Sequence, residues 1–121
     1  MKMQESPEDY LECIHVLSLE LPEVRSIDVA RHLGFSKPSV SVAMKRLREN
    51  GYVNMDDNGY LTLTESGMAI ALKVYERHEV LTKYLTSIGV SEEIAAKDAC
   101  RIEHVISEES FRKIQSLLPQ E

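Results

Sequence analysis

A cysteine, a glutamate and a histidine follow one another at helical spacing near the end of the sequence. Cys100, Glu103 and His104 stand at positions i, i+3 and i+4, so on a helix their side chains would share one face. Thiolate, carboxylate and imidazole together form a donor set for a transition metal ion. A structural explanation stays open, with Cys100 a small buried apolar residue, Glu103 a solvated charge and His104 a helix-end residue.

Two other groups of residues favour the metal interpretation. His78 falls on the apolar stripe of the preceding helical segment, where an imidazole needs a polar partner. Asp9 and Glu12 lie three residues apart near the start of the chain, so both carboxylates share one face of a helix. Asp9 also has a second explanation, because a carboxylate at the third helical position after Ser6 can cap the helix.

The elements that must position these side chains are mostly helical. Apolar residues at helical spacing, bounded by Pro, Gly and capping residues, predict helices over about residues 6–21, 26–33, 38–50, 64–88, 91–106 and 108–118. The runs 52–55 and 60–63 predict two short strands, joined by the hairpin turn Asp56-Asp57-Asn58-Gly59. The chain is therefore predicted to be mainly α, with an N-terminal winged helix-turn-helix domain (residues 1–70) and a C-terminal helical domain (residues 71–121).

The second helix of the predicted helix-turn-helix carries residue types that bind DNA. Small hydroxyl residues at its start can approach bases and phosphates, and Lys and Arg can neutralise phosphates. We predict the following DNA contacts: Arg25, Ser36, Lys37, Pro38, Ser39, Ser41, Lys45 and Arg46. The alternative for Lys45, Arg46 and Arg48 is an ordinary solvated face. The acidic pair Asp56 and Asp57 at the hairpin tip argues against phosphate contacts by the wing.

Charge and composition restrict the class of protein. The formal net charge of -6 disfavours nucleic acid at first sight, but residues 24–55 hold six basic residues against two acidic ones, a locally basic element. No apolar run reaches membrane-spanning length, and the first residues lack the apolar core of a signal peptide. Two cysteines do not make a disulfide framework. We expect a cytoplasmic protein without a membrane partner.

Four motifs are shared with a known family. They are Asp98-Ala99-Cys100-Arg101-Ile102-Glu103-His104-Val105-Ile106-Ser107-Glu108-Glu109, Glu8-Asp9-Tyr10-Leu11-Glu12, Arg77-His78-Glu79 and Ser39-Val40-Ser41. The first three resemble the ligand-bearing segments, and the last the recognition helix, of the diphtheria-toxin-repressor family of iron- and manganese-dependent regulators. The order of elements agrees from about Ser6 to Leu118. The resemblance implies a short member without the SH3-like domain, in which the C-terminal helical domain binds metal and forms the dimer.

The resemblance implies one regulatory metal site, lined by Asp9, Glu12, His78, Cys100, Glu103 and His104. This set is a hybrid, because Cys100 matches the iron branch, where the manganese branch has Glu. Asp9 matches the manganese branch, where the iron branch has Met. Thr82 and Ala96 stand where the iron branch has a Glu and a His, so we expect its ancillary site to be missing.

The donor chemistry leaves the metal open. A thiolate is softer than a carboxylate, so Cys100 favours Fe(II), Co(II), Zn(II) or Cd(II), whereas the carboxylates favour Mn(II) or Fe(II). We expect Mn(II) or Fe(II), with Co(II), Zn(II) or Cd(II) as surrogates. Whether one or two ions bind stays open.

The resemblance implies a homodimer that binds a near-palindromic operator on double-stranded DNA and represses metal-uptake genes, with no small organic substrate and no catalysis. We expect apolar residues of the last two helices to pack within a lobe and across a two-fold interface: Ala95, Ala99, Ile106, Phe111, Ile114, Leu117 and Leu118. In this mechanism the ion cancels the repulsion among Asp9, Glu12 and Glu103.

Three alternatives to this function stay open. They are a metal-independent winged-helix regulator, a cysteine redox switch through Cys13 or Cys100, and a small metalloenzyme. The metalloenzyme is disfavoured because nearly all polar groups would be used as ligands.

Overall fold

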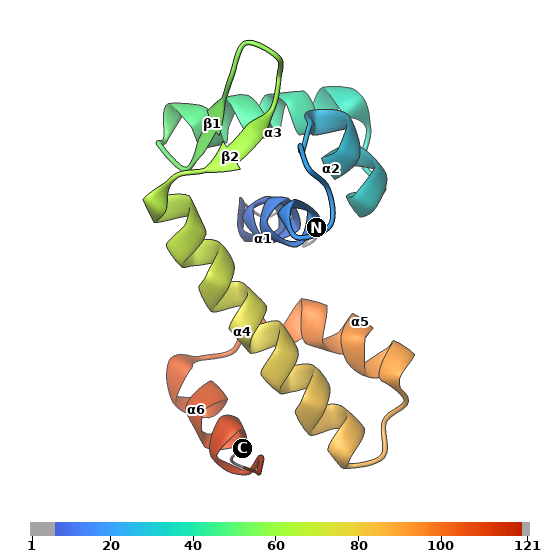
Figure 1. Cartoon of the computed structure of the whole chain (residues 1–121). Helices are drawn as coiled ribbons and strands as arrows, with labels where there is room; N and C mark the ends of the chain where they lie inside the picture. The colour runs from blue at the N-terminus through green and yellow to red at the C-terminus, as the bar shows by residue number, and fades with distance from the viewer. Residues whose placement is uncertain (1–6, 120–121) are drawn as a thin grey trace. The chain divides into compact units, whose positions relative to one another are not determined.

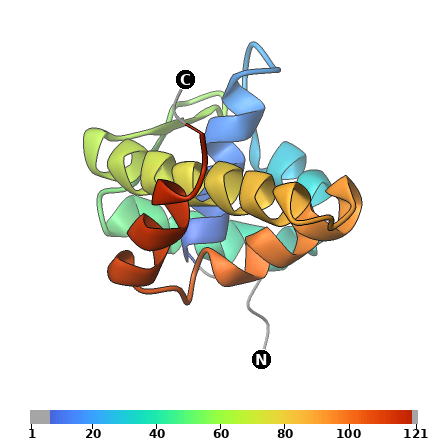
Figure 2. The same cartoon turned by 90° about the horizontal axis from the view of Figure 1, so that it is seen from below.

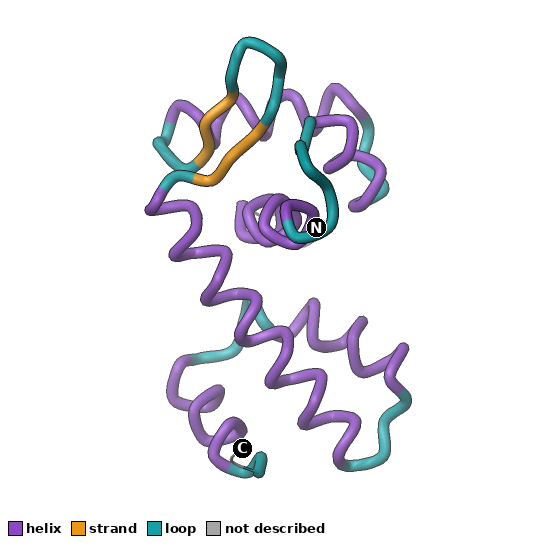
Figure 3. Tube along the Cα trace, in the orientation of Figure 1, coloured by secondary structure: helices purple, strands orange, loops and turns teal. Residues whose placement is uncertain are grey.

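The computed structural model describes residues 7–119, in which helices predominate and two strands form a hairpin (Figure 3). The elements are α1 (Pro7–Ser18), α2 (Ser26–Leu33), α3 (Lys37–Glu49), β1 (Val53–Met55), β2 (Leu61–Leu63), α4 (Glu65–Ser87), α5 (Glu92–Ile102) and α6 (Glu108–Ser116). The predicted mainly α class is confirmed. Ser6, where the first helix was predicted to begin, lies outside the described residues. No described helix combines the length and apolar character needed to cross a membrane.

The chain forms two compact units, Met1–Leu72 (unit 1) and Lys73–Glu121 (unit 2), and their boundary falls inside α4. Unit 1 contains α1, α2, α3, the hairpin and the start of α4. Unit 2 contains the rest of α4 with α5 and α6.

The core of unit 1 is built from the apolar faces of α1, α2 and α3, and in Figure 1 α1 lies below α2, α3 and the hairpin. Leu11 and Ile14 of α1, Val29 of α2 and Val40 and Met44 of α3 are each at most 1% exposed. These residues recur every three or four positions, which is the spacing that puts side chains on one face of a helix. Burying them fixes which face of α3 is left to solvent.

Two local signals set the helix-turn-helix. Gly34 ends α2 with a φ of 73°, a left-handed conformation that glycine adopts without steric cost, and its N–H donates to the Ala30 carbonyl. Ser36 then starts α3, because its hydroxyl oxygen accepts a hydrogen bond from the Ser39 N–H at 3.3 Å. The predicted turn between these helices is therefore present.

The wing is a two-stranded antiparallel hairpin in which Val53 pairs with Leu63 and Met55 with Leu61. At its tip the Asp56 Oδ1 atom accepts hydrogen bonds from the backbone N–H groups of Asn58 and Tyr60, both at 2.9 Å. One of the two acidic side chains at the tip is therefore bonded to the turn itself, as Asp commonly is in turns.

The hairpin is joined to α4 by a close backbone contact. The Thr64 Oγ1 atom accepts a hydrogen bond from the Gly67 N–H at 3.1 Å, so Thr64 caps α4 at the residue where this helix was predicted to begin. A Cβ atom at Gly67 would lie 2.1 Å from the Tyr52 carbonyl oxygen, far inside van der Waals contact. Only glycine fits there.

In unit 2 the later turns of α4 lie beside α5 and α6, as the two views agree (Figures 1 and 2). Ala95 and Ala99 of α5 are 0% exposed and Phe111 of α6 is 1% exposed, so these three predicted lobe residues are buried within a single chain. Ser91 and Ser107 cap α5 and α6 with their hydroxyl oxygens.

Candidate metal centre and nucleic-acid interface

A buried carboxylate stands between two imidazoles in unit 2. The Glu103 Oε1 atom lies 2.9 Å from the His78 Nδ1 atom, a hydrogen bond between the end of α5 and the middle of α4. The Glu103 Oε2 atom lies 3.4 Å from the His104 Nε2 atom. Glu103 is only 1% exposed, and carboxylates are almost never buried so fully unless they are paired or bind a metal.

One oxygen of the Glu103 carboxylate shows whether this centre can hold a cation. Its Oε2 atom is buried and accepts no hydrogen bond from any described residue. A buried acceptor without a donor destabilises the protein by about 1–3 kcal/mol, and by more when it is charged. A divalent cation would satisfy that oxygen, and imidazole nitrogens are common transition-metal ligands. The residues present therefore fit a metal ion.

The backbone departs from the prediction at the end of α5. All three donors were expected on one helix, but α5 ends at Ile102, Glu103 is its C-cap residue, and His104 lies in the following turn. Glu103 still has helical dihedral angles, and its N–H donates to the Ala99 carbonyl. The expectation was thus wrong for His104, whose side chain approaches Glu103 from the turn. Cys100 lies on α5, partly buried, and forms no disulfide.

Arg77 explains why the helix stops here, a role that was not predicted from the sequence. The Arg77 Nη1 atom donates to the backbone carbonyls of Glu103 and Ile106, at 3.2 and 2.9 Å. Its Nη2 atom donates to Glu108 Oε1 at 3.0 Å, and its guanidinium carbon lies 5.4 Å from the centre of the Phe111 ring. One side chain therefore holds the turn that carries His104 and joins it to α6. Its position next to His78 was the only sequence signal.

Replacing Arg77 by Lys should loosen this turn, because a single ammonium group cannot reproduce the planar fork of donors. We expect the free energy of unfolding to fall by about 1–3 kcal/mol. We also expect metal affinity to fall roughly 10- to 100-fold, the usual effect of removing a group that orients ligands. Urea unfolding and metal titration measure both. Arg101→Lys, an exposed site on α5, is the matched control, and equal behaviour of the two variants would contradict the assigned role.

Asp9 and Glu12 lie on α1 of unit 1, where Asp9 is 6% exposed and Glu12 is partly buried. Both therefore lie within the helix that the sequence predicted, three residues apart. Their participation in the metal centre of unit 2 stays a prediction.

Cys13, the other cysteine, is part of the unit 1 core and is 3% exposed. Burial, together with the charges of Glu12 and Asp9, raises the pKa of its thiol to about 12. At pH 8 the thiol stays protonated, and only the thiolate is a good nucleophile.

We therefore expect Cys13 to resist alkylation by iodoacetamide in the folded protein. A Cys100→Ser variant isolates the Cys13 signal, and mass spectrometry after timed alkylation measures it. The same variant in denaturant should react quickly. Rapid labelling of the folded variant would show that Cys13 is accessible. It would then favour the alternative in which Cys13 acts as a redox switch.

The predicted DNA contacts form an exposed surface on unit 1. All eight residues are exposed, on α3 or at the starts of α2 and α3. The Arg25 guanidinium carbon stacks 4.7 Å from the centre of the Tyr60 ring, and its Nη2 atom donates to Tyr60 Oη at 3.1 Å. The structure thus links Arg25 to the wing, at the end of its turn. Ser36, by contrast, uses its hydroxyl oxygen as a helix cap.

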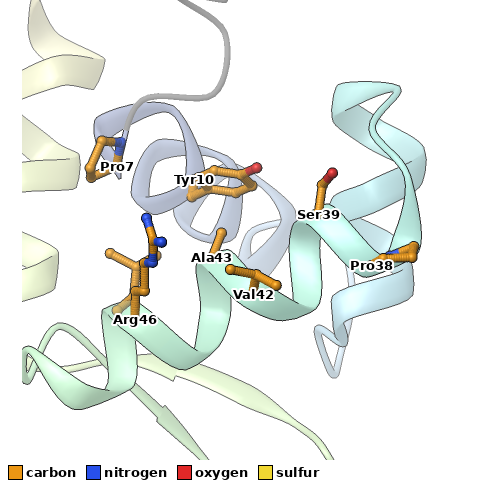
Figure 4. A pocket seen from close by; sticks show the side chains of 8 residues that line it. Pro7, Tyr10, Pro38, Ser39, Val42, Ala43 and Arg46 are labelled. Carbon is orange, nitrogen blue, oxygen red and sulfur yellow. The ribbon is translucent and has the colours of Figure 1, made fainter.

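A hollow of about 480 Å³ lies beside this surface, between α1 and α3. Figure 4 shows Ser39, Val42 and Arg46 on the side of α3 that faces it, with Tyr10 and Pro7 of α1 opposite. Val42 is 54% exposed and was not among the predicted contacts.

Comparison with known proteins identifies two domains of one family. Residues 2–63 match the family described as the iron dependent repressor, N-terminal DNA binding domain. Residues 64–120 match the iron dependent repressor, metal binding and dimerisation domain.

Individual relatives agree with these matches. The transcriptional regulator MntR of Salmonella typhimurium is 38% identical over 104 residues, which are 86% of this chain and 66% of that protein. The HTH-type transcriptional regulator MntR of Lysinibacillus sphaericus is 34% identical over 93% of this chain and 81% of its own length. An uncharacterised HTH-type transcriptional regulator of Methanocaldococcus jannaschii is 31% identical over 93% of this chain and 92% of its own length.

Solved structures give the same result. A manganese-dependent transcriptional repressor in complex with manganese has a TM-score of 0.85 at 27% identity, over 92% of this chain and 51% of that one. IdeR of T. acidophilum has a TM-score of 0.81, also at 27% identity, over 92% and 53%. This chain therefore spans about half the length of these structures and 66% of the Salmonella regulator.

Proposed function

This chain belongs to the iron-dependent repressor family, the diphtheria-toxin-repressor family that its motifs resemble, and we propose that it is a metal-dependent transcriptional repressor. The observation that carries the proposal is the buried Glu103 carboxylate between His78 and His104. It occurs in a chain whose other unit presents an exposed helix-turn-helix surface. The relatives are transcriptional regulators rather than enzymes.

In the proposed metal site, Glu103, His78 and His104 supply carboxylate and imidazole ligands, and Cys100 supplies a thiolate. Asp9 and Glu12 complete the donor set. Their support is the family resemblance and the helical spacing of two carboxylates on α1. When bound, the ion supplies positive charge that offsets the repulsion among these carboxylates. Arg77 keeps the His104 turn in place through its bonds to the Glu103 and Ile106 carbonyls.

The proposed regulatory step follows from a ligand set drawn from both units. An ion held by Asp9 and Glu12 of unit 1 and by the ligands of unit 2 would restrict the relative motion of the two units, and the restricted arrangement would bind the operator. By linkage, DNA must tighten metal binding by the same factor as metal tightens DNA binding. A coupling of about 1–3 kcal/mol changes operator affinity roughly 5- to 150-fold.

We propose Mn(II) or Fe(II) as the native metal, with Co(II), Zn(II) and Cd(II) as surrogates. The thiol of Cys100 favours the softer ions and the carboxylates favour the harder ones. Cys100→Glu should therefore shift the preference toward Mn(II).

The proposed partners are double-stranded DNA with a near-palindromic operator and a second copy of this chain. Large apolar side chains exposed on unit 2 support the homodimer: Ile88, Ile94, Val105 and Leu117. Two helix-turn-helix surfaces related by a two-fold axis would then bind two half-sites. We propose a cytoplasmic location, because a repressor must reach the chromosome.

The test is operator binding, titrated separately with Mn(II), Fe(II), Co(II) and Zn(II) under anaerobic conditions and repeated with chelator. We expect affinity to rise at least fivefold with the native metal and to return to the metal-free value with chelator. Equal affinity with metal and with chelator would favour a metal-independent winged-helix regulator and would reject the proposed function.

A further inference from the structure

An apolar side chain stands on the solvent face of α3 without a place in the core. The buried residues of this helix are Val40, Met44 and Leu47. At 100° per residue, Val42 points to the opposite side of the helix, and it is 54% exposed. Val42 lines the hollow between α1 and α3, but about half of it stays exposed, so burial within this unit does not account for its residue type.

The surroundings of Val42 are those of a DNA-reading surface. Ser39 and Ser41 precede it, Lys45 and Arg46 follow it, and all four are exposed. Val42 is the sixth residue of α3, in the N-terminal half that meets base edges when such a helix enters the major groove. The neighbouring side chains can bond to phosphates or to polar base atoms, whereas Val42 has no donor or acceptor.

Only one apolar group is available on base edges in the major groove. Adenine, guanine and cytosine present donors and acceptors there, whereas thymine also presents its C5 methyl group. A valine that meets a polar base edge would desolvate it without giving a hydrogen bond, which is unfavourable. From this chemistry we infer that Val42 selects thymine in each half-site of the operator, by contact between its γ-methyl groups and the C5 methyl group. The inference rests on the proposed DNA-binding function and adds a base preference to it.

The experiment begins with selection of bound sequences from random duplex DNA by the full chain, once with Mn(II) and once with chelator. Each thymine of the selected site is then replaced, one at a time, by deoxyuridine. This substitution removes the methyl group and keeps the base pairing and every polar atom. Affinities are measured for wild type, Val42→Ala and the control Leu19→Ala, which changes another exposed apolar residue of unit 1.

We expect wild type to lose roughly 3- to 10-fold in affinity at one thymine per half-site, the effect of losing one buried methyl group and its contacts. Val42→Ala should bind the thymine site more weakly and lose less than about 2-fold on deoxyuridine substitution, because the two changes remove the same contact. Leu19→Ala should behave like wild type. Alanine favours helix more than valine does, so this variant keeps α3 intact.

The outcomes separate the inference from the function on which it rests. If a site is selected but no thymine is sensitive to deoxyuridine, or if Val42→Ala keeps the full penalty, the inference is overturned and the function stands. If the same site is selected equally with chelator, metal control is rejected, and the deoxyuridine series still decides the role of Val42. If no sequence is selected under either condition, the proposed function and this inference both fail.

Discussion

Glu103→Gln is expected to abolish the metal response while leaving the metal-free protein at least as stable as wild type. The neutral amide is a poor metal ligand, and it keeps the size of the side chain. It also removes a buried charge whose Oε2 atom accepts no hydrogen bond among the described residues, which should relieve part of the cost of burying that oxygen. The variant thus separates binding from folding, because the two effects have opposite signs.

Thermal unfolding with and without Mn(II) measures both effects. A ligand at 100 times its dissociation constant stabilises the folded state by about 2.7 kcal/mol, which should raise the wild-type melting temperature by roughly 10 °C. Glu103→Gln should show almost no rise and at least a 100-fold loss of metal affinity. Glu92→Gln, which removes an exposed carboxylate from the same helix α5, should respond like wild type. A normal metal shift in Glu103→Gln would remove Glu103 from the ligand set.

Gly67→Ala is expected to destabilise unit 1 strongly, against what helix propensity predicts. In an exposed helix this substitution stabilises by about 0.5–1 kcal/mol. Here the new Cβ would lie 2.1 Å from the Tyr52 carbonyl oxygen and 3.1 Å from its carbon. The atoms that clash with this Cβ belong to the backbone of Tyr52 and cannot rotate away as a side chain can. The start of α4 and the start of the wing must therefore move apart. We expect a net loss of about 2–4 kcal/mol.

Urea unfolding followed by circular dichroism gives this loss directly. Ser66→Ala, one residue earlier and exposed, is the control and should change stability by less than about 0.5 kcal/mol. Because the displaced segment includes β1, DNA binding by Gly67→Ala should weaken together with stability. A variant as stable as Ser66→Ala would mean that the contact between α4 and Tyr52 relaxes without cost.

Most of the helices could be predicted because their ends carry local signals. Thr64, Ser91 and Ser107 are N-caps, Gly34 ends α2 in a left-handed conformation, and the turn before Gly59 closes the hairpin. Each signal depends only on the types and the spacing of a few neighbouring residues, so it can be recognised in the sequence.

The features that escaped prediction depend on residues far apart in the sequence. Arg77 meets the carbonyls of Glu103 and Ile106, 26 and 29 residues away, and these bonds end α5 before His104. Arginine is common on exposed helix faces, so its type gave no indication of this role. The constraint on Gly67 has no local signal either, because the Tyr52 carbonyl that excludes a side chain belongs to another part of the sequence. The metal ligands could be proposed from type and spacing, but the orphaned oxygen of Glu103 could not.

That orphaned oxygen has a consequence for the lifetime of the protein in the cell. A buried carboxylate oxygen that accepts no hydrogen bond among the described residues makes the metal-free chain open more often, and proteases degrade open chains. Metal starvation should then shorten the half-life of the regulator as well as weaken its hold on DNA. Its abundance would fall together with its occupancy of DNA, so that repression is lost through two routes at once.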